Sequence, residues 1–251
     1  MKTAIFLQYH KITNRFEMGG TWTPVSFFKR HVEFVRAKGM KSLTRDELKG
    51  KKWRDGSVLF TFDDGYRCVY ENAYSILEKK GFKAAVFVVT NFIGKKNNWD
   101  INFGLKFPHM TIKQLRELHE MGWIIGSHSH NHLDLTRLPD QQLRNELRIS
   151  KEILEDIVGD EVFAIAYPYG RYNLRVLEVA GELGYAIGFG TTKGKVYSGY
   201  EYLSLKRRGV YAIDFSIRAK IDSIPFISSL ERLKERIITR VSDIPAVLKS
   251  I

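Results

Sequence analysis

The stretch SVLFTFDDGY, residues 57–66, indicates both the fold and the chemistry of this chain. It begins with an apolar run and ends in two adjacent carboxylates, Asp63 and Asp64, followed by Gly65. Continuous apolar runs are typical of strands buried in parallel sheets, and a glycine permits a sharp turn at the strand end. Two neighbouring carboxylates repel each other unless a cation or a shared proton relieves the repulsion. The stretch therefore predicts a buried strand that delivers two acidic side chains to a cleft; a loop with two solvated aspartates is the alternative.

The composition indicates a globular protein with an excess of positive charge. The 251 residues are 44% hydrophobic and 27% charged, which suits a single domain with one core. The net charge of +12 predicts attraction to something anionic: nucleic acid, a membrane surface or a phosphate-bearing substrate. The single cysteine, Cys68, excludes an internal disulfide and is compatible with a reducing compartment. The apolar segment at the N-terminus is too short for a signal sequence or a membrane span, so we expect a cytoplasmic protein.

Strand and helix signals alternate along the chain. Apolar runs predict strands at residues 3–9, 58–62, 84–89, 123–126, 162–166 and 185–189, with a last strand at 210–213. Helical patterns lie between most of them, and the clearest covers residues 139–158. This alternation is typical of βαβ units and a parallel sheet. Residues 91–109 contain glycine and proline and predict a long loop over one end of the sheet.

The last part of the chain has a different character. We expect a barrel domain at residues 1–213 and a basic, largely helical extension at residues 214–251. In the extension, Leu230, Leu233 and Ile237 share a helix face opposite Arg232 and Arg236. Such a helix either packs on the barrel with a solvated basic face or rests on the anionic inner face of a membrane.

Ionisable and polar residues recur where the predicted strands end. They are His10, the Asp63–Asp64 pair, the HSHNH cluster at residues 128–132 and the YPYG stretch at residues 167–170. In parallel α/β folds, active sites are built at the carboxyl ends of the strands. His128 and His132 with a nearby carboxylate suit a two-histidine, one-carboxylate site for zinc or a similar divalent ion. An open position on such an ion holds water with a pKa of about 7. A surface loop with histidines by chance is the alternative.

Together these motifs resemble the polysaccharide deacetylase family, the NodB-homology domains of carbohydrate esterase family 4. The stretch TFDDG at residues 61–65 resembles the first family motif, and HSHNH at residues 128–132 has the His-Ser-x-x-His form of the second. The stretch YPYG at residues 167–170 resembles the third, and the likeness extends over residues 3–212. The resemblance implies an α/β fold, a distorted (β/α) barrel with about seven strands.

The resemblance also implies a role for each motif residue. A divalent metal, most often zinc with cobalt, nickel or manganese as alternatives, would be bound by Asp64, His128 and His132. Asp63 would be the general base that takes a proton from water, since a metal beside it keeps it ionised. The backbone N–H of Tyr169, after Pro168, would stabilise the oxyanion of the tetrahedral intermediate.

Two departures from the family pattern affect these roles. Ala166 stands where the third motif usually begins with an arginine that holds the base, and no histidine follows His132 to supply the usual general acid. A subgroup of the family shares YPYG and an N-terminal Tyr-His, and in it His10 is the candidate acid; a merely structural His10 is the alternative. Arg207 or Arg208 could take the place of the missing arginine near Asp63.

The sequence thus predicts a metal-dependent hydrolase that removes an acyl group, most often acetyl, from an N-acylated amino sugar. We expect a cytoplasmic glycan precursor or a lipid-linked sugar as substrate, with peripheral membrane association. Hydrolysis of a non-sugar amide on the same scaffold and an inactive sugar-binding homologue are the alternatives. The chain has no nucleic-acid-binding motif and its basic residues are scattered, so we expect no nucleic-acid partner.

Overall fold

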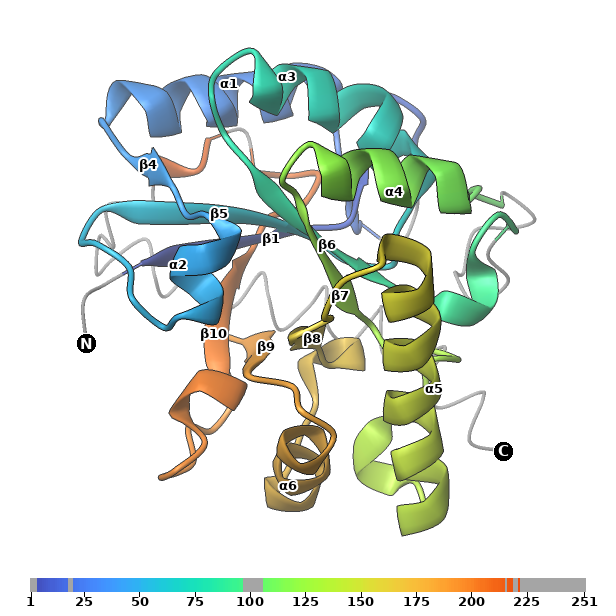
Figure 1. Cartoon of the computed structure of the whole chain (residues 1–251). Coiled ribbons are helices and arrows are strands. Elements are labelled where there is room, and N and C mark those ends of the chain that lie inside the picture. Colours follow the sequence, from blue (N-terminus) through green and yellow to red (C-terminus); the bar gives the residue numbers. More distant parts are fainter. Residues whose placement is uncertain (1–3, 18–19, 97–105, 215, 219–220, 222–251) are drawn as a thin grey trace.

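A computed structural model describes residues 4–17, 20–96, 106–214, 216–218 and 221, and these residues form a closed parallel barrel of seven strands (Figure 1). The strands run in the order β1-β10-β9-β8-β7-β6-β5, and pairing of β1 with β5 closes the barrel. Their bounds are β1 Ile5–Tyr9, β5 Ser57–Phe62, β6 Ala84–Val88, β7 Ile124–Ser127, β8 Ala164–Ala166, β9 Ile187–Thr191 and β10 Leu205–Gly209. The predicted α/β barrel is confirmed.

Shorter strands and helices complete the fold. The strand β4 (Lys41–Ser42) extends the sheet beyond β5, while β2 (Lys11–Ile12) pairs with β3 (Trp22–Thr23) just after β1. Helices surround the barrel, and α1, α3 and α4 cover one side of it while α5 and α6 cover another (Figure 1). Their bounds are α1 Val25–Ala37, α2 Arg45–Lys49, α3 Tyr74–Glu78 after a π-helical turn at Val69–Ala73, α4 Ile112–Glu120, α5 Asp140–Val158 and α6 Leu174–Glu182.

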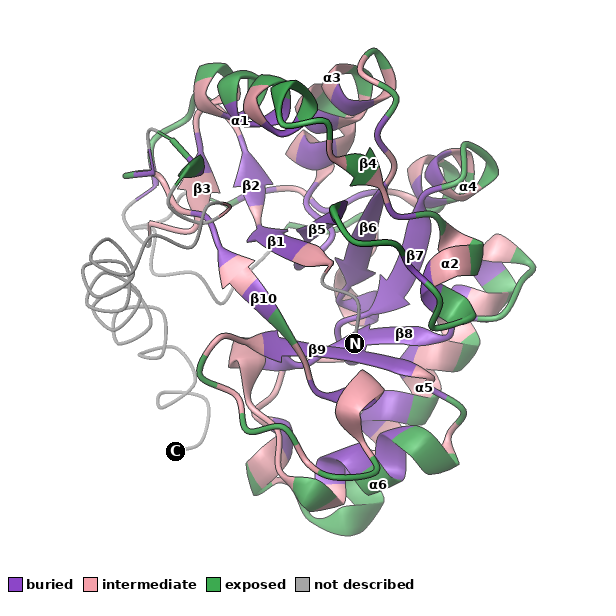
Figure 2. Cartoon of the chain, turned by 90° about the vertical axis from the view of Figure 1, so that its left-hand side faces the viewer, coloured by how far each residue is buried: buried purple, intermediate pink, exposed green. Residues whose placement is uncertain are grey.

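Except for β10, the barrel strands are buried on both faces, which is why they appear in the sequence as continuous apolar runs. Most strand residues are buried (Figure 2), and because side chains alternate along a strand, β1 and the strands from β5 to β8 each contribute to two separate apolar clusters. The inner cluster fills the barrel and includes Phe6, Leu59, Phe87 and Phe189. The outer cluster joins the strands to the helices and includes Leu7, Phe60, Val32 and Leu115. Trp53 packs edge-on against Phe6, with ring centroids 6.0 Å apart, and joins the inner cluster from the segment after α2.

The prediction for the last strand was wrong. It placed the strand at residues 210–213, whereas β10 spans Leu205–Gly209 and carries three consecutive basic residues. Lys206 is exposed and Arg208 is half-buried, while Arg207 points into the barrel, where it forms an ion pair. Because strands were predicted from apolar runs, a strand whose inward position holds a paired arginine was missed.

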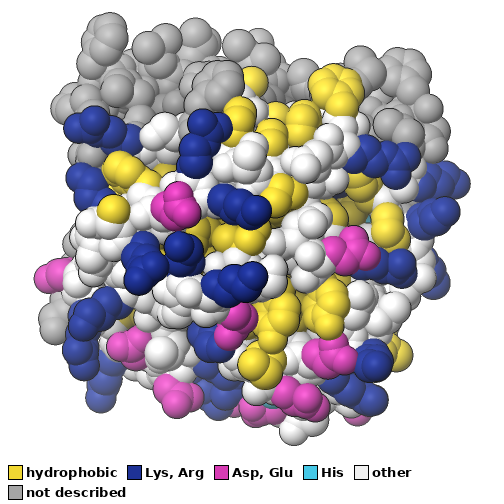
Figure 3. All heavy atoms as spheres, turned by 90° about the horizontal axis from the view of Figure 1, so that it is seen from above, with side chains coloured by type: hydrophobic (Ala, Val, Ile, Leu, Met, Phe, Trp, Pro, Cys, Tyr) yellow, Lys and Arg dark blue, Asp and Glu magenta, His cyan; other side chains and the backbone are white. Residues whose placement is uncertain are grey.

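Two regions with sequence predictions lie partly outside the described residues. They are the predicted extension at residues 214–251 and the middle of the loop at residues 91–109. The long loop, the domain boundary and the basic helix therefore stay predictions. Among the described helices, none is long and apolar enough to cross a membrane. On the face shown in Figure 3, lysines and arginines are spread among acidic and apolar side chains, as the scatter in the sequence suggests.

Close packing around Gly188 in β9 leads to a stability prediction. A Cβ atom at this position would overlap the carbonyl oxygen of Leu203 and the hydroxyl of Tyr167, which itself donates a hydrogen bond to that carbonyl at 2.9 Å. Gly188→Ala is therefore expected to lower the free energy of unfolding by about 1–3 kcal/mol, measured by urea denaturation. Gly181→Ala in α6 is the matched control, because its Cβ would lie 3.5 Å from Leu203, an ordinary contact. There alanine should be neutral or stabilising by up to about 1 kcal/mol, and equal effects of the two substitutions would contradict the packing argument.

Candidate active site

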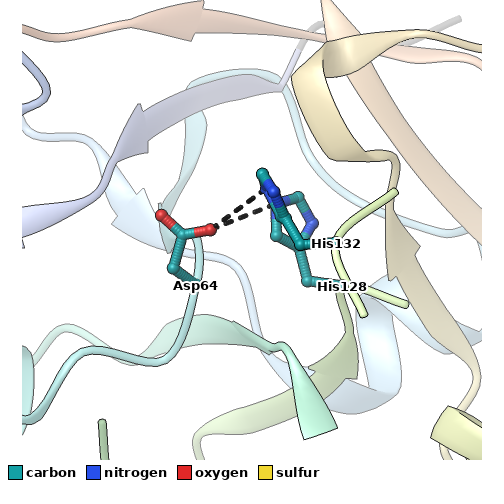
Figure 4. A group of neighbouring side chains, drawn as sticks. All are labelled: Asp64, His128 and His132. Atoms are coloured by element: carbon teal, nitrogen blue, oxygen red, sulfur yellow. Dashed lines mark ion pairs between the residues drawn. The ribbon is translucent and has the colours of Figure 1, made fainter. Parts of the chain in front are cut away.

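Three predicted metal ligands lie together at the carboxyl ends of the barrel strands (Figure 4). Asp64 follows β5, His128 follows β7, and His132 lies in the loop after β7. The Oδ1 atom of Asp64 is 3.6 Å from Nε2 of His128 and 3.4 Å from Nε2 of His132. One ligand atom from each residue lies within 4.8 Å of the others, and all three residues are buried. One carboxylate and two imidazoles that converge in this way are a donor set that fits a divalent ion such as zinc.

The tautomer of His128 is fixed by its surroundings. Its Nδ1 lies 2.7 Å from the carbonyl oxygen of Ala166, which can only accept a hydrogen bond, so Nδ1 carries the hydrogen. The lone pair of Nε2 is then directed towards Asp64 and the space between the three ligands, as a metal ligand requires. Burial also lowers the pKa of His128, although the Asp63 charge and the bond to Ala166 oppose that shift. His128 is therefore neutral at pH 7.

Asp63 lies beside this cluster and is held from two neighbouring strands. Its carboxylate accepts two hydrogen bonds from the Arg207 guanidinium, one from Nη1 to Oδ1 at 2.6 Å and one from Nη2 to Oδ2 at 2.8 Å. Gln8 of β1 donates a further bond from Nε2 to Oδ2 at 2.7 Å. Arg207 also donates to the hydroxyl of Thr61 at 3.1 Å. Since Asp63 is 1% exposed and Arg207 is fully buried, this is an ion pair inside the barrel.

The charge state of Asp63 follows from this pair. Burial raises the pKa of a carboxyl group, but the charge of Arg207 and its hydrogen bonds outweigh burial and hold the pKa of Asp63 well below its usual range. Asp63 is therefore ionised and can accept a proton, but it is a weak base. The acidity of an attacking water must be raised if Asp63 is to take its proton.

His10 directly follows β1 and lies near Asp63. Its Nε2 is 4.0 Å from Oδ2 of Asp63, and its side chain is 17% exposed. Burial lowers the pKa of His10 to about 4, and the Asp63 charge opposes this shift without reversing it. His10 is thus neutral at pH 7 and must gain a proton before it can act as an acid.

The backbone is strained at the residues that form the site. The described residues include five non-glycine residues with positive φ, and four of them belong to the motifs: Asp64 at 69°, Ser129 at 63°, His132 at 57° and Tyr169 at 59°. Such conformations cost of order 1–3 kcal/mol each and persist only where the surrounding structure enforces them. The strain therefore marks the same site as the motifs do.

The YPYG stretch lies against the second histidine ligand. The ring centroids of Tyr169 and His132 lie 4.7 Å apart, and the Tyr169 hydroxyl donates a hydrogen bond to the His132 carbonyl at 3.4 Å. Pro168 is buried, and Gly170 adopts φ 65° where a Cβ would overlap Thr191. The structure thus places Tyr169 beside the predicted metal ligand His132, while its predicted role as an oxyanion donor stays a prediction.

Two residues that contact the site, Gln8 and His109, were not predicted from the sequence. Gln8 stands two residues before His10, so both point inward from β1, and this spacing was the available signal. His109 is buried, and its Nδ1 donates to the backbone carbonyl of Asp64 at 2.8 Å. No spacing in the sequence indicates the contact of His109, because residues 64 and 109 meet only through the fold. Of the two arginines considered for Asp63, the structure places Arg207 there.

Comparisons with known proteins agree with this geometry. The polysaccharide deacetylase family model matches residues 50–188. The Bacillus subtilis protein YxkH, assigned by name to the polysaccharide deacetylases, is 33% identical over 193 residues, which are 75% of this chain and 64% of YxkH, less than two thirds of it. The poly-β-1,6-N-acetyl-D-glucosamine N-deacetylase of Staphylococcus aureus is 27% identical over 213 residues, covering 74% of this chain and 71% of that protein.

Solved structures show the same fold. The Streptococcus pyogenes deacetylase PplD, solved with acetate, superposes with a TM-score of 0.70 at 26% identity, over 84% of this chain and 93% of that one. IcaB from Ammonifex degensii superposes with a TM-score of 0.72 at 21% identity, over 86% and 94% of the two chains. The chain belongs to the polysaccharide deacetylase family.

Proposed function

We propose that this chain is a divalent-metal-dependent hydrolase that removes the acetyl group from an N-acetylated amino sugar in a glycan or glycan precursor. The observation that carries the proposal is the buried cluster of Asp64, His128 and His132 beside the ion-paired Asp63. When bound, a divalent ion supplies a Lewis acid for the amide carbonyl and activates water as a nucleophile.

The residues around the cluster supply the remaining chemistry. Amide hydrolysis forms a bond from the water oxygen to the acetyl carbon and breaks the bond to the sugar nitrogen. Asp63 takes the proton of the attacking water, and Arg207 and Gln8 fix the plane of its carboxylate during the transfer.

The leaving amine needs a proton, and His10 is the residue proposed to donate it. Because burial lowers the pKa of His10 to about 4, the imidazole must be protonated during the reaction. Asp63, whose Oδ2 lies 4.0 Å from Nε2 of His10, receives a proton in the preceding step and can pass it on. The backbone N–H of Tyr169 is proposed to stabilise the oxyanion.

The substrate class rests on family membership and on the name of the Staphylococcus aureus relative, which acts on an N-acetylglucosamine polymer. We therefore propose a substrate built from N-acetylated hexosamine. The lipid-linked form of the substrate, the cytoplasmic location and the membrane contact of the extension stay predictions.

Metal removal tests the proposal directly. Purified protein should contain about one equivalent of a divalent ion, and acetate release from β-linked N-acetylglucosamine oligomers should fall to background after chelation. Zinc, cobalt, nickel and manganese would then be added back separately, and at least one should restore the rate. An N-acetylated amino acid serves as the non-sugar amide in the same assay. Acetate release that survives chelation, or that occurs only from the amino acid, would contradict the proposal.

A further inference from the structure

The turn at residues 129–132, between the two predicted histidine ligands, has all four of its backbone N–H groups bonded to side-chain oxygens. The N–H of Ser129 donates to the hydroxyl of Ser127 at 3.1 Å, and the N–H of His132 donates to the hydroxyl of Ser129 at 3.0 Å. Between them, the N–H groups of His130 and Asn131 both donate to Oε2 of Glu146, at 3.0 and 2.8 Å. The turn contains two strained residues, with φ 63° at Ser129 and 57° at His132, so these acceptors oppose its relaxation.

Glu146 is an unusual residue for its place in the fold. It lies on the buried stripe of α5, between Leu143 and Leu147, and is 4% exposed. A buried carboxylate is costly unless hydrogen bonds or a counter-charge compensate it. Within the described part of the chain Glu146 forms no ion pair, and its described hydrogen bonds all come from the histidine turn.

A second layer of contacts holds the same turn. Asn131 donates from Nδ2 to Oε1 of Glu146 at 2.5 Å and accepts from Nδ2 of Asn91 at 2.7 Å. The hydroxyl oxygen of Thr90 lies 2.8 Å from Nδ1 of His130. The loop after β6 and the helix α5 therefore hold the turn from two sides, and Glu146 is the charged member of this network.

We propose that Glu146 is a positioning residue for the metal site, which sets how far apart His128 and His132 are held before the ion binds. The inference rests on the proposed function, because it concerns the affinity of the same three ligands. Glu146 itself contacts no ligand side chain in the described hydrogen bonds; it acts through the amides of residues 130 and 131. A turn that must reorganise when the metal binds lowers metal affinity. Groups that orient metal ligands typically raise metal affinity 10- to 100-fold.

The test compares two glutamates of the same helix. Glu146→Gln replaces one carboxylate oxygen by an N–H donor that faces other donors, whereas Glu152→Gln makes the same change at an exposed residue paired with Arg148. Zinc affinity of the full chain is measured by competition with a chromophoric chelator. Glu146→Gln is expected to raise the zinc dissociation constant about 10- to 100-fold and Glu152→Gln to leave it unchanged. At saturating zinc, kcat of Glu146→Gln should stay within about threefold of the parent, since the described hydrogen bonds of Glu146 do not reach Asp63 or His10.

A second readout does not depend on metal. In chelated protein, hydrogen exchange of the amides of His130 and Asn131 should be faster in Glu146→Gln than in Glu152→Gln. If Glu146→Gln does not fold, Glu146→Asp decides: it keeps the charge but shortens the side chain, which draws the carboxylate away from both amides, and it should raise the zinc dissociation constant about 10-fold. Unchanged zinc affinity in the folded Glu146→Gln variant, or in Glu146→Asp where that variant must decide, would overturn the inference. A parent chain that binds no zinc or other divalent ion would instead refute the proposed function.

Discussion

Arg207→Met is expected to lower the free energy of unfolding by about 3–5 kcal/mol and to reduce acetate release to near background. Asp63 is 1% exposed, and Arg207 donates to both of its carboxylate oxygens. Without the guanidinium, a buried carboxylate would keep only the hydrogen bond from Gln8 and would lose its charge partner. Burial would then govern Asp63, and its pKa would rise from the low value that Arg207 now helps to maintain.

Two controls separate the ion pair from other effects of the substitution. Arg208→Met changes the neighbouring residue of β10, which is half-buried and paired in register with Leu7, and it should cost less stability. The double variant Asp63→Asn/Arg207→Met removes both charges and should recover part of the stability lost in Arg207→Met. Urea denaturation measures all three, and a single variant Arg207→Met as stable as the parent would show that the pair contributes little to folding.

The sequence predicts the barrel because its strands obey one simple rule. Six strands are buried on both faces and appear as apolar runs, so their positions follow from the local apolar pattern of the sequence. The seventh, β10, breaks the rule because its inward residue Arg207 is stabilised by Asp63, more than a hundred residues earlier in the chain. A charge that is compensated by a distant partner has no local signature.

The same reasoning explains which site residues were found. His128, His132 and the Asp63–Asp64 pair were identified because chemistry requires their residue types at strand ends, and the division of roles between the two aspartates came from the family resemblance. Gln8, His109 and Glu146 have ordinary residue types, and their roles depend on contacts that only the closed barrel creates. The positive φ angles of Asp64 and Tyr169 also could not be predicted, because a left-handed backbone conformation at a non-glycine residue is imposed by tertiary structure.

The two adjacent aspartates are expected to differ sharply when each is replaced by asparagine. Asp64 points at the imidazoles of His128 and His132, so Asp64→Asn removes the anionic member of the metal donor set. Asp63→Asn leaves those three residues unchanged, but it removes the proposed general base. We therefore expect Asp64→Asn to lose bound metal and activity together, and Asp63→Asn to retain metal while kcat falls about 10²- to 10⁴-fold.

Metal content and acetate release must be measured on the same preparations, at saturating substrate and metal. Asp63→Asn also leaves Arg207 buried without its anionic partner, so a folding defect has to be distinguished from a chemical one. Asp63→Asn/Arg207→Met, which removes both charges, provides that control: it should be more stable than either single variant and no more active than Asp63→Asn. If Asp63→Asn keeps more than about a tenth of the parent kcat, Asp63 is not the base, and its ion pair with Arg207 serves the fold alone.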